Sequence, residues 1–262
     1  MSYLYETHLH TTQSSACALS SGRDYIKIYK DLGYTGIFVT DHFYNGNSTL
    51  PRNLPWHDWV TRFCRGYEDA KNEGERQGLD VFFGWEETFD NCDDYLIYGL
   101  DREWLLEHPE SKSWSRGEQY RAVKAAGGCV VQAHPFRQHY YIRRIVLSSG
   151  CVDAVEAANA CNNEQAYDAL AMRYAKRLEL PVTAGSDIHD VRQAQAGYTF
   201  GIYLEEKLNL RQDIVKVICN NRISGMRISP GRCNYHNEKA GIPLEVRDKD
   251  DRIIKKRLEE LI

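Results

Sequence analysis

The sequence of 262 residues contains no CxxC pair, although it has eight cysteines. The cysteines are scattered along the chain, which is not the spacing of a zinc ribbon or of a small domain held together by disulfides. We therefore expect most of them to be reduced thiols, several of them in the core. They are Cys17, Cys64, Cys92, Cys129, Cys151, Cys161, Cys219 and Cys233.

Long apolar runs are also missing, and the first residues do not show the basic, apolar and small-residue order of a signal peptide. There is no excess of basic residues either, because 33 Lys and Arg stand against 37 Asp and Glu. A protein without a basic field is a poor partner for long nucleic acid. We expect a cytoplasmic protein that acts on a small substrate, with no membrane or long nucleic-acid partner. The sequence leaves the oligomeric state open.

Eight short segments have the composition of buried strands, because they are dense in Val, Ile, Phe and Tyr. They are residues 4–8, 36–40, 79–85, 95–99, 128–133, 152–157, 182–186 and 198–203. Longer segments between them have apolar residues at helical spacing, and several end in Gly, as helices commonly do. These helical segments are residues 22–34, 57–78, 116–128 and 163–180.

Alternating strands and helices predict βα units and a parallel sheet. Seven or eight such units in one chain of this length favour an α/β barrel, closed or distorted, although a doubly wound open sheet has the same alternation. We predict one catalytic barrel over residues 1–225. Residues 226–262 are expected to form a loop rich in Gly, Pro and Asn, followed by a charged terminal helix, "DDRIIKKRLEELI", packed on the same domain.

Polar side chains gather at the ends of the predicted strands. The carboxyl ends of parallel strands meet at one end of a barrel, so residues that are distant in sequence should meet there. They are His8 and His10, Asp41 and His42, Glu86 and Glu87, Asp94, His134, Glu156 and Asn159, and Asp187 and His189.

The stretch "YETHLHTT" places His8 and His10 on the same face of the first predicted strand, because side chains alternate along a strand. Alone, this pair is as typical of a half-buried strand as of a metal site. Five histidines with carboxylates at one barrel end favour metal, since unpaired buried polar groups are costly. Imidazole and carboxylate ligands suit Zn²⁺, Mn²⁺ or Fe²⁺, and a bridging carboxylate would allow more than one ion.

The ordered motifs "HLH", "TDH", "GWE", "AHPFR", "EAAN" and "GSDIH" resemble those of the PHP superfamily, named for polymerase and histidinol phosphatase, over residues 3–203. The resemblance implies a distorted (β/α)7 barrel of the PHP type that hydrolyses phosphoesters with two to three divalent metal ions. It implies a first ion held by His8, His10, Glu86 and Asp187, a second held by Glu86, Asp94 and His134, and a third held by His42 and His189.

Two positions depart from that pattern. Many relatives have a further His after the first motif, where this chain offers only Gln13, Ser14, Ser15 and Cys17. We therefore expect the third ion to be the weakest. Relatives commonly have His at the start of the fourth strand, where the best match is Asp94, with Asp93 as the alternative. A carboxylate there favours harder ions such as Mn²⁺.

The sequence predicts a metal-dependent phosphatase or phosphodiesterase that hydrolyses a small phosphorylated metabolite or nucleotide through a metal-bridged hydroxide. Arg137 is a candidate phosphate clamp or else a surface arginine. Asp41 and His189 are candidate acids for the leaving group, although Asp41 could instead orient a ligand His. His139 is a candidate substrate contact. Monoester or diester preference and the native metal stay open.

Three alternatives remain. A metal-dependent amidohydrolase barrel also carries HxH on its first strand, but we find no obvious mid-barrel lysine to bridge its metals. A PHP-type exonuclease acting on short oligonucleotides would use the same residues. A non-enzymatic relic would require lost ligands, whereas the chain contains all of His8, His10, Glu86, His134, Asp187 and His189.

Overall fold

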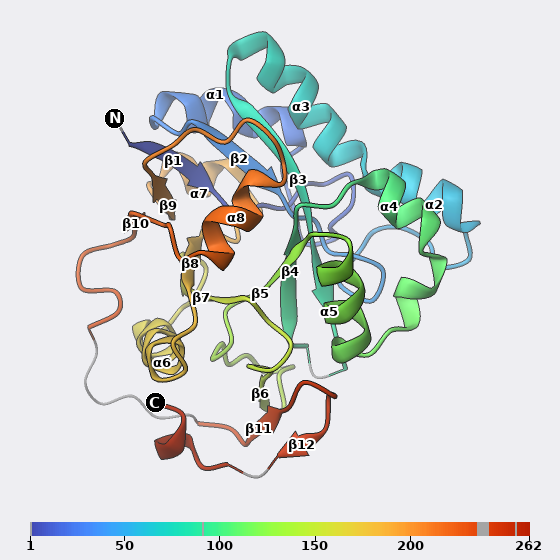
Figure 1. Cartoon of the computed structure of the whole chain (residues 1–262). Helices are drawn as coiled ribbons and strands as arrows, with labels where there is room; N and C mark the ends of the chain where they lie inside the picture. Colours follow the sequence, from blue (N-terminus) through green and yellow to red (C-terminus); the bar gives the residue numbers. More distant parts are fainter. Residues whose placement is uncertain (1, 91, 235–240, 255) are drawn as a thin grey trace.

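The computed structural model describes residues 2–90, 92–234, 241–254 and 256–262. Its main sheet curls into a nearly closed barrel with the strand order β10-β9-β1-β2-β3-β4-β5-β7-β8 (Figure 1). These strands are β1 (Tyr3–Glu6), β2 (Gly36–Val39), β3 (Asp80–Thr88), β4 (Asp94–Tyr98), β5 (Cys129–Gln132), β7 (Ala154–Asn159), β8 (Val182–Gly185), β9 (Gly201–Leu204) and β10 (Gly225–Arg227). A small second sheet contains β6 (Ile145–Leu147), β11 (Leu244–Arg247) and β12 (Ile253–Ile254).

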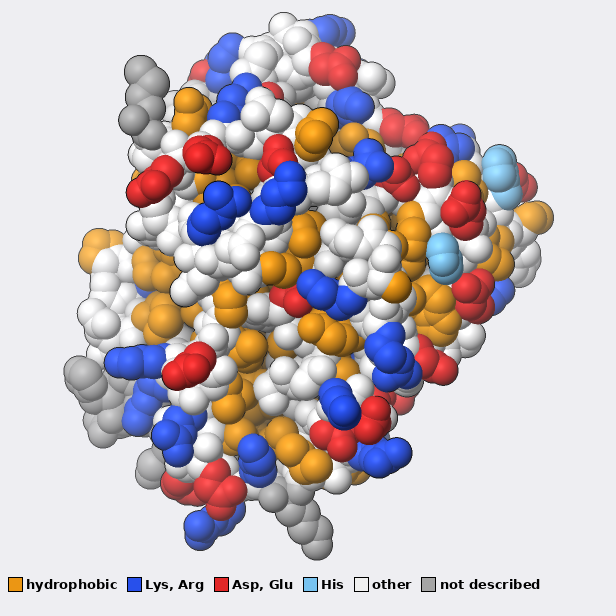
Figure 2. Space-filling model, viewed as in Figure 1, with side chains coloured by type: hydrophobic (Ala, Val, Ile, Leu, Met, Phe, Trp, Pro, Cys, Tyr) orange, Lys and Arg blue, Asp and Glu red, His pale blue; other side chains and the backbone are white. Residues whose placement is uncertain are grey.

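Helices surround the barrel, and α8 lies across one of its ends (Figure 1). They are α1 (Gly22–Asp31), α2 (Trp56–Phe63), α3 (Arg65–Gln77), α4 (Arg102–Glu107), α5 (Arg116–Ala125), α6 (Gln165–Arg177), α7 (Val191–Gln195) and α8 (Asp213–Cys219), with short 3-10 helices η1 (Pro109–Ser113) and η2 (Leu258–Glu260). None of the helices in the described ranges has the length and apolar character needed to cross a membrane. On the face shown in Figure 2, basic and acidic side chains are interspersed.

The predicted α/β barrel is confirmed, and each predicted strand has a counterpart in the main sheet. The helical segment 57–78 is two helices, α2 and α3, which meet at Cys64. The expected wholly parallel sheet is wrong at β4, which runs antiparallel to both β3 and β5, and at β9, which runs antiparallel to β1. The connection from β3 to β4 spans only residues 89–93, which is too short for the crossover that parallel strands need.

The predicted terminal helix is also wrong. Ile253 and Ile254 form β12, which pairs with β11, and β11 in turn runs parallel to β6. The end of the chain beyond them contains only η2 as regular structure in the part that the structure describes. Part of the expected loop, residues 235–240, lies outside the described residues, as does His236. The boundary at residue 225 stays a prediction.

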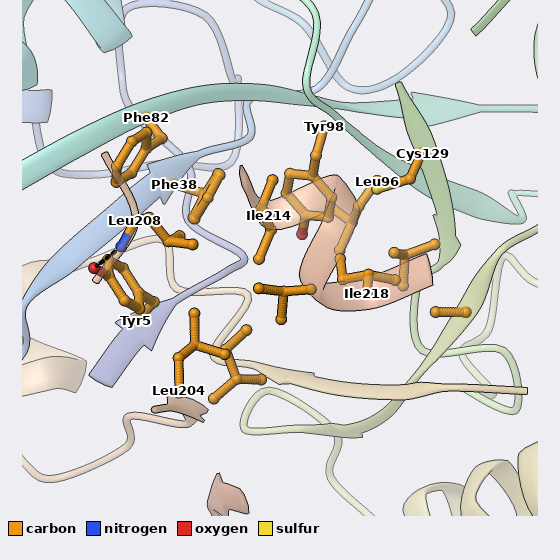
Figure 3. Packing of buried hydrophobic residues seen from close by; sticks show 14 of the residues in the cluster. Tyr5, Phe38, Phe82, Leu96, Tyr98, Cys129, Leu204, Leu208, Ile214 and Ile218 are labelled. Carbon is orange, nitrogen blue, oxygen red and sulfur yellow. Dashed lines mark hydrogen bonds between the residues drawn. The ribbon is translucent and has the colours of Figure 1, made fainter. Parts of the chain in front are cut away.

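Apolar side chains fill the end of the barrel where the parallel strands begin. Phe38 and Tyr98 point into the barrel and pack with Ile214 and Ile218 of α8 (Figure 3). Leu208, in the loop before α8, donates its backbone N–H to the hydroxyl of Tyr5 at 2.9 Å. This apolar plug leaves the opposite end of the barrel, where the parallel strands finish, for polar side chains.

The barrel closes where the chain leaves β1 and β8. Asp187 donates its backbone N–H to the carbonyl of His8 at 2.8 Å, and His10 donates to the carbonyl of Ile188 at 2.9 Å. Gly185 permits this approach, because a Cβ there would lie 2.6 Å from the Cβ of His8. The motifs "HLH" and "GSDIH" are thereby fixed side by side.

Candidate metal centre

The predicted site residues that follow the parallel strands converge at the open end of the barrel. His8 and His10 lie just beyond β1, and Leu9 between them faces the other way into the apolar cluster under α1. The rings of His8 and His10 are 5.1 Å apart, on one side of the segment, as the alternation predicts. The other members of the cluster are His42 after β2, Glu86 in β3, Asp94 at the start of β4, His134 after β5, and Asp187 and His189 after β8.

The carboxylate of Glu86 lies in the middle of this cluster. Its Oε1 is 3.1 Å from Nε2 of His8 and 3.2 Å from Nε2 of His134. Its Oε2 is 2.7 Å from Nδ1 of His42 and 3.5 Å from Nε2 of His10. Burial raises the pKa of Glu86, but His8 and His42 outweigh it and hold the pKa well below its usual range. Glu86 therefore has the position that a bridging ligand requires.

Asp187 also contacts both His8 and His10. Its Oδ1 is 3.1 Å from Nε2 of His10 and 3.5 Å from Nε2 of His8, and its Oδ2 is 2.6 Å from Nη1 of Arg137. Burial opposes ionisation, yet Arg137 and His8 keep the pKa of Asp187 well below its usual range. The backbone of Asp187 has φ 54° and that of His134 has φ 29°. A positive φ is uncommon for residues other than Gly and is often found at functional sites.

Asp94, rather than Asp93, faces the cluster. One ligand atom each of Glu86, Asp94 and His134 lie within 4.8 Å of one another. Asp93 instead accepts two hydrogen bonds of 2.7 Å from the guanidinium of Arg116. Because β4 is antiparallel, its first residue lies beside the end of β5, which brings Asp94 to the same end of the barrel as His134.

A third group consists of His10, His42 and His189, which each offer a ring nitrogen within 4.8 Å of the others. The rings of His42 and His189 stack against that of His10 at 4.3 and 4.4 Å. The thiol of Cys17 forms hydrogen bonds with His189 and His42. Burial raises the pKa of this thiol, but the hydrogen bonds and the charges of the two histidines together outweigh burial and lower the pKa to about 6.

The cluster fits divalent metal ions. Four of its buried atoms have no well-aligned hydrogen bond among the described residues, although ring nitrogens and carboxylate oxygens lie close together. These atoms are Nε2 of His8, Nε2 of His10, Nδ1 of His42 and Oε2 of Glu86. Buried polar atoms are normally satisfied, and imidazole with carboxylate is the donor set of Zn²⁺, Mn²⁺ and Fe²⁺ sites.

Glu156 supports the cluster, a role that the sequence analysis did not assign to it. Its Oε1 is 3.0 Å from Nδ1 of His8, and its Oε2 accepts from the backbone N–H of His134 at 3.1 Å. Asn159 donates to the same Oε2 at 2.8 Å. A carboxylate on the far nitrogen of a ligand His fixes the orientation of the ring and increases its basicity. The only signal in the sequence was the position of Glu156 in a motif at the end of a strand.

Asp41 faces away from the cluster. Its Oδ1 accepts from the backbone N–H of Thr11 and from Oγ of Ser15, both at 2.6 Å, and its Oδ2 accepts from Oγ1 of Thr11 at 2.6 Å. The same Ser15 hydroxyl lies 3.2 Å from Nδ1 of His10. These contacts favour the orienting role for Asp41 over that of an acid for the leaving group.

Arg137 lies at the edge of the cluster with its guanidinium held in place. Nε donates to Oδ1 of Asn162 and Nη2 donates to Oδ1 of Asn159, each at 2.8 Å, and Nη1 pairs with Asp187. With five N–H donors in a guanidinium, two remain for a ligand. Arg137 also lines a small pocket together with Asp94 and His134.

His139 lies on an exposed loop outside this cluster. Its ring is 4.6 Å from that of Tyr140 and 4.4 Å from that of Tyr141. Tyr140 is 93% exposed. Burial raises the pKa of Tyr141. The charge of Arg137 lowers this pKa, and the charges of Asp94 and Asp187 raise it. The three rings therefore form an aromatic surface beside the pocket of Arg137.

A larger cavity, of about 900 Å³, lies at the other end of β3, between α3 and the loop before α8. Three of its basic side chains are paired with acidic ones: Arg102 with Glu68, Lys207 with Asp80, and Arg211 with Asp101. This cavity is remote from Glu86 and contains none of the candidate ligands.

Comparison with known proteins supports the fold. No protein-family model and no curated protein matches the sequence. A two-domain protein from Bacteroides vulgatus, which contains a predicted PHP-like metal-dependent phosphoesterase, is 16% identical, with a TM-score of 0.58 over 85% of this chain and 64% of that protein. A protein from Bifidobacterium adolescentis, whose assignment as a metal-dependent phosphoesterase is also a prediction, is 18% identical, with a TM-score of 0.52 over 84% of this chain and 96% of that protein.

Endonuclease Q, solved with a 27-mer duplex that has an abasic lesion at the active site, is 12% identical, with a TM-score of 0.55 over 87% of this chain and 58% of the enzyme. At sequence identities this low, the similarity shows a shared fold and does not show a shared activity. The chain therefore has the PHP-type fold that its ordered motifs predicted, a distorted α/β barrel that it shares with the Bacteroides vulgatus protein containing a predicted PHP-like metal-dependent phosphoesterase.

Proposed function

We propose that this protein is a metal-dependent phosphoesterase of the PHP type that hydrolyses a small phosphorylated metabolite or a nucleotide. The position of Glu86 carries the proposal, because its two oxygens each lie between histidines of different groups. The first ion would be held by His8, His10, Glu86 and Asp187, and the second by Glu86, Asp94 and His134. When bound, the ions would supply a hydroxide at neutral pH and neutralise the phosphoryl oxygens.

The protein's own groups orient the substrate and the ligands. Arg137 presents its free N–H donors beside the second site, where they can hold phosphoryl oxygens. Glu156 keeps Nε2 of His8 aimed at Glu86. His189 cannot both bind an ion and donate a proton to the leaving group, because a ligand imidazole must be neutral. Its ring nitrogen lies within 4.8 Å of nitrogens of His10 and His42, which favours the ligand role.

A substrate panel tests the proposed function. The protein should hydrolyse p-nitrophenyl phosphate or its diester in the presence of Mn²⁺, and it should be inactive on simple amides and lactones. Amide or lactone hydrolysis without phosphoesterase activity would instead identify an amidohydrolase. Inactivity on every ester with all metal sites filled would favour a relic.

We expect Arg137→Ala to lower kcat/KM for phosphoesters while metal content stays at the wild-type level. Losing a charge-assisted contact costs about 1.5–3 kcal/mol, or roughly a 10- to 150-fold loss. Arg137→Lys should restore only part of the activity, because an ammonium group is a point charge rather than a planar fork. Arg143→Ala, an exposed arginine of the same loop, is the control. Unchanged kcat/KM in Arg137→Ala would return this residue to a structural role.

The aromatic surface of His139, Tyr140 and Tyr141 favours a nucleotide among the small substrates. Stacking of a base on an aromatic side chain is worth about 1–3 kcal/mol. We therefore expect Tyr140→Ala to raise KM for a nucleoside monophosphate roughly tenfold and to leave KM for ribose phosphate unchanged. Tyr198→Ala, another exposed tyrosine, is the matched control. Equal effects of Tyr140→Ala on both substrates would count against base recognition.

A further inference from the structure

The loop after "HLH" brings a cysteine to the place where the motif pattern has no histidine. Two backbone hydrogen bonds fix this loop between the other two candidate ligands of the third group. Ala16 donates to the carbonyl of Asn47, in the loop that follows His42, at 2.8 Å, and Leu19 donates to the carbonyl of His189 at 2.6 Å. Cys17 lies between these two anchors, so its position is determined by both neighbouring loops.

Other polar side chains of this loop are already engaged elsewhere. Gln13 donates to Asp69 at 2.9 Å, and Ser14 donates to the carbonyl of Phe63 at 2.7 Å. The hydroxyl of Ser15 donates to Asp41. The thiol of Cys17, in contrast, contacts the rings of His42 and His189.

A second observation points to a ligand at this place. The rings of His42 and His189 lie 4.3 and 4.4 Å from the ring of His10, which is fully buried. Three imidazoles that offer nitrogens within 4.8 Å of one another form a place where a cation would be stabilised.

We propose that Cys17 is a metal ligand, and that its thiolate completes a third site with His42 and His189. The proposal rests on the proposed metal-dependent phosphoesterase centre and adds a ligand that the motif pattern does not contain. His10 is left to the first site, where its Nε2 lies 3.1 Å from Asp187. With three protein ligands, the third ion should be retained, which replaces the expectation of a weak third ion.

Cys161 is the other thiol near His189, and its contacts argue against the same role. Its Sγ lies 3.0 Å from the carbonyl oxygen of Asp187 and donates to it. Cys161 also contacts His189. Cys161 therefore provides a matched control, since it is a second cysteine beside the same histidine.

A thiolate changes which ion the third site prefers. Soft sulfur ligands favour Zn²⁺, Co²⁺ or Fe²⁺ over Mn²⁺, whereas the additional carboxylate of Asp94 makes the second site harder. Ions of two kinds could therefore occupy one centre, with the softer ion beside Cys17.

Cobalt substitution tests the proposal without relying on activity. The Co²⁺-loaded wild-type protein should retain three equivalents after dialysis and show thiolate-to-cobalt charge-transfer absorption in the near ultraviolet. Cys17→Ser should lose this absorption and retain two equivalents, whereas Cys161→Ser should keep both properties of the wild type. The Zn²⁺ form should show a sulfur neighbour at about 2.3 Å by X-ray absorption, and Cys17→Ser should not.

The possible failures are distinguishable. If wild-type protein binds Co²⁺ without charge-transfer absorption, or if Cys17→Ser keeps that absorption, the Cys17 ligand is excluded while the proposed function stands. If no Co²⁺ binds at any site, both the ligand and the proposed function fail. The two ions retained by Cys17→Ser also report that this variant is folded.

Discussion

Replacing Glu86 with Gln should remove metal and activity together. The carboxylate lies within 3.5 Å of four histidine nitrogens, and an amide keeps its size but removes the negative charge that two ions would share. Metal ions contribute several kcal/mol to transition-state stabilisation, and each 1.36 kcal/mol is a factor of ten in rate. We therefore expect kcat/KM to fall at least about 10³-fold, with less than two ions retained after dialysis.

The neighbouring residue offers a matched control. Glu87 is buried on the same strand, and burial together with the charge of Asp94 raises its pKa well above the usual range. The raised pKa favours the neutral form of this carboxyl group, and Glu87 belongs to none of the groups of candidate ligands, so Glu87→Gln should leave the metal content unchanged. Wild-type metal content in Glu86→Gln would contradict the bridging position, as would an equal loss in Glu87→Gln.

The strands of the barrel could be predicted because their amino-acid composition is typical of buried strands. Segments dense in Val, Ile, Phe and Tyr became β1 to β5 and β7 to β9. Strand direction could not be predicted in the same way, since composition and period are the same for parallel and antiparallel strands. For β4, the only clue was the short connection over residues 89–93.

The terminal segment shows how tertiary contacts override local preference. "DDRIIKKRLEELI" has the charge pattern of a helix, but Ile254 packs into the apolar cluster around Val246 and Leu147. Pairing with β11 also satisfies backbone groups of Ile253 and Ile254. Burial against an existing sheet edge outweighed a modest helix propensity.

The candidate ligands that follow strands could be predicted, because the ends of the strands converge independently of the loop conformations. The residues that support these ligands could not be predicted. Cys17 and Ser15 lie in one loop, and only the backbone path decides that the hydroxyl contacts Asp41 while the thiol reaches His42. Spacing in the sequence contains no such information.

Exhaustive chelation should abolish hydrolysis without unfolding the protein. Bound water in such centres has a pKa near 7 rather than about 15.7, so hydroxide becomes scarce at neutral pH when the ions leave. We expect at least a roughly 10³-fold loss of kcat, restored by added Mn²⁺, Zn²⁺ or Co²⁺. Full turnover after chelation and desalting would exclude the metal mechanism.

The fold should survive because the apolar clusters that hold the barrel contain none of the metal-binding side chains. Stability should nevertheless fall, since an ion held at a hundred times its Kd stabilises the folded state by about 2.7 kcal/mol. For a chain of this size, that loss corresponds to roughly a 5–10 °C lower Tm for each tightly held ion. Unchanged far-ultraviolet circular dichroism with a lower Tm after chelation is the expected result. An unchanged Tm would mean that the buried His and carboxylate groups stabilise one another equally well without ions.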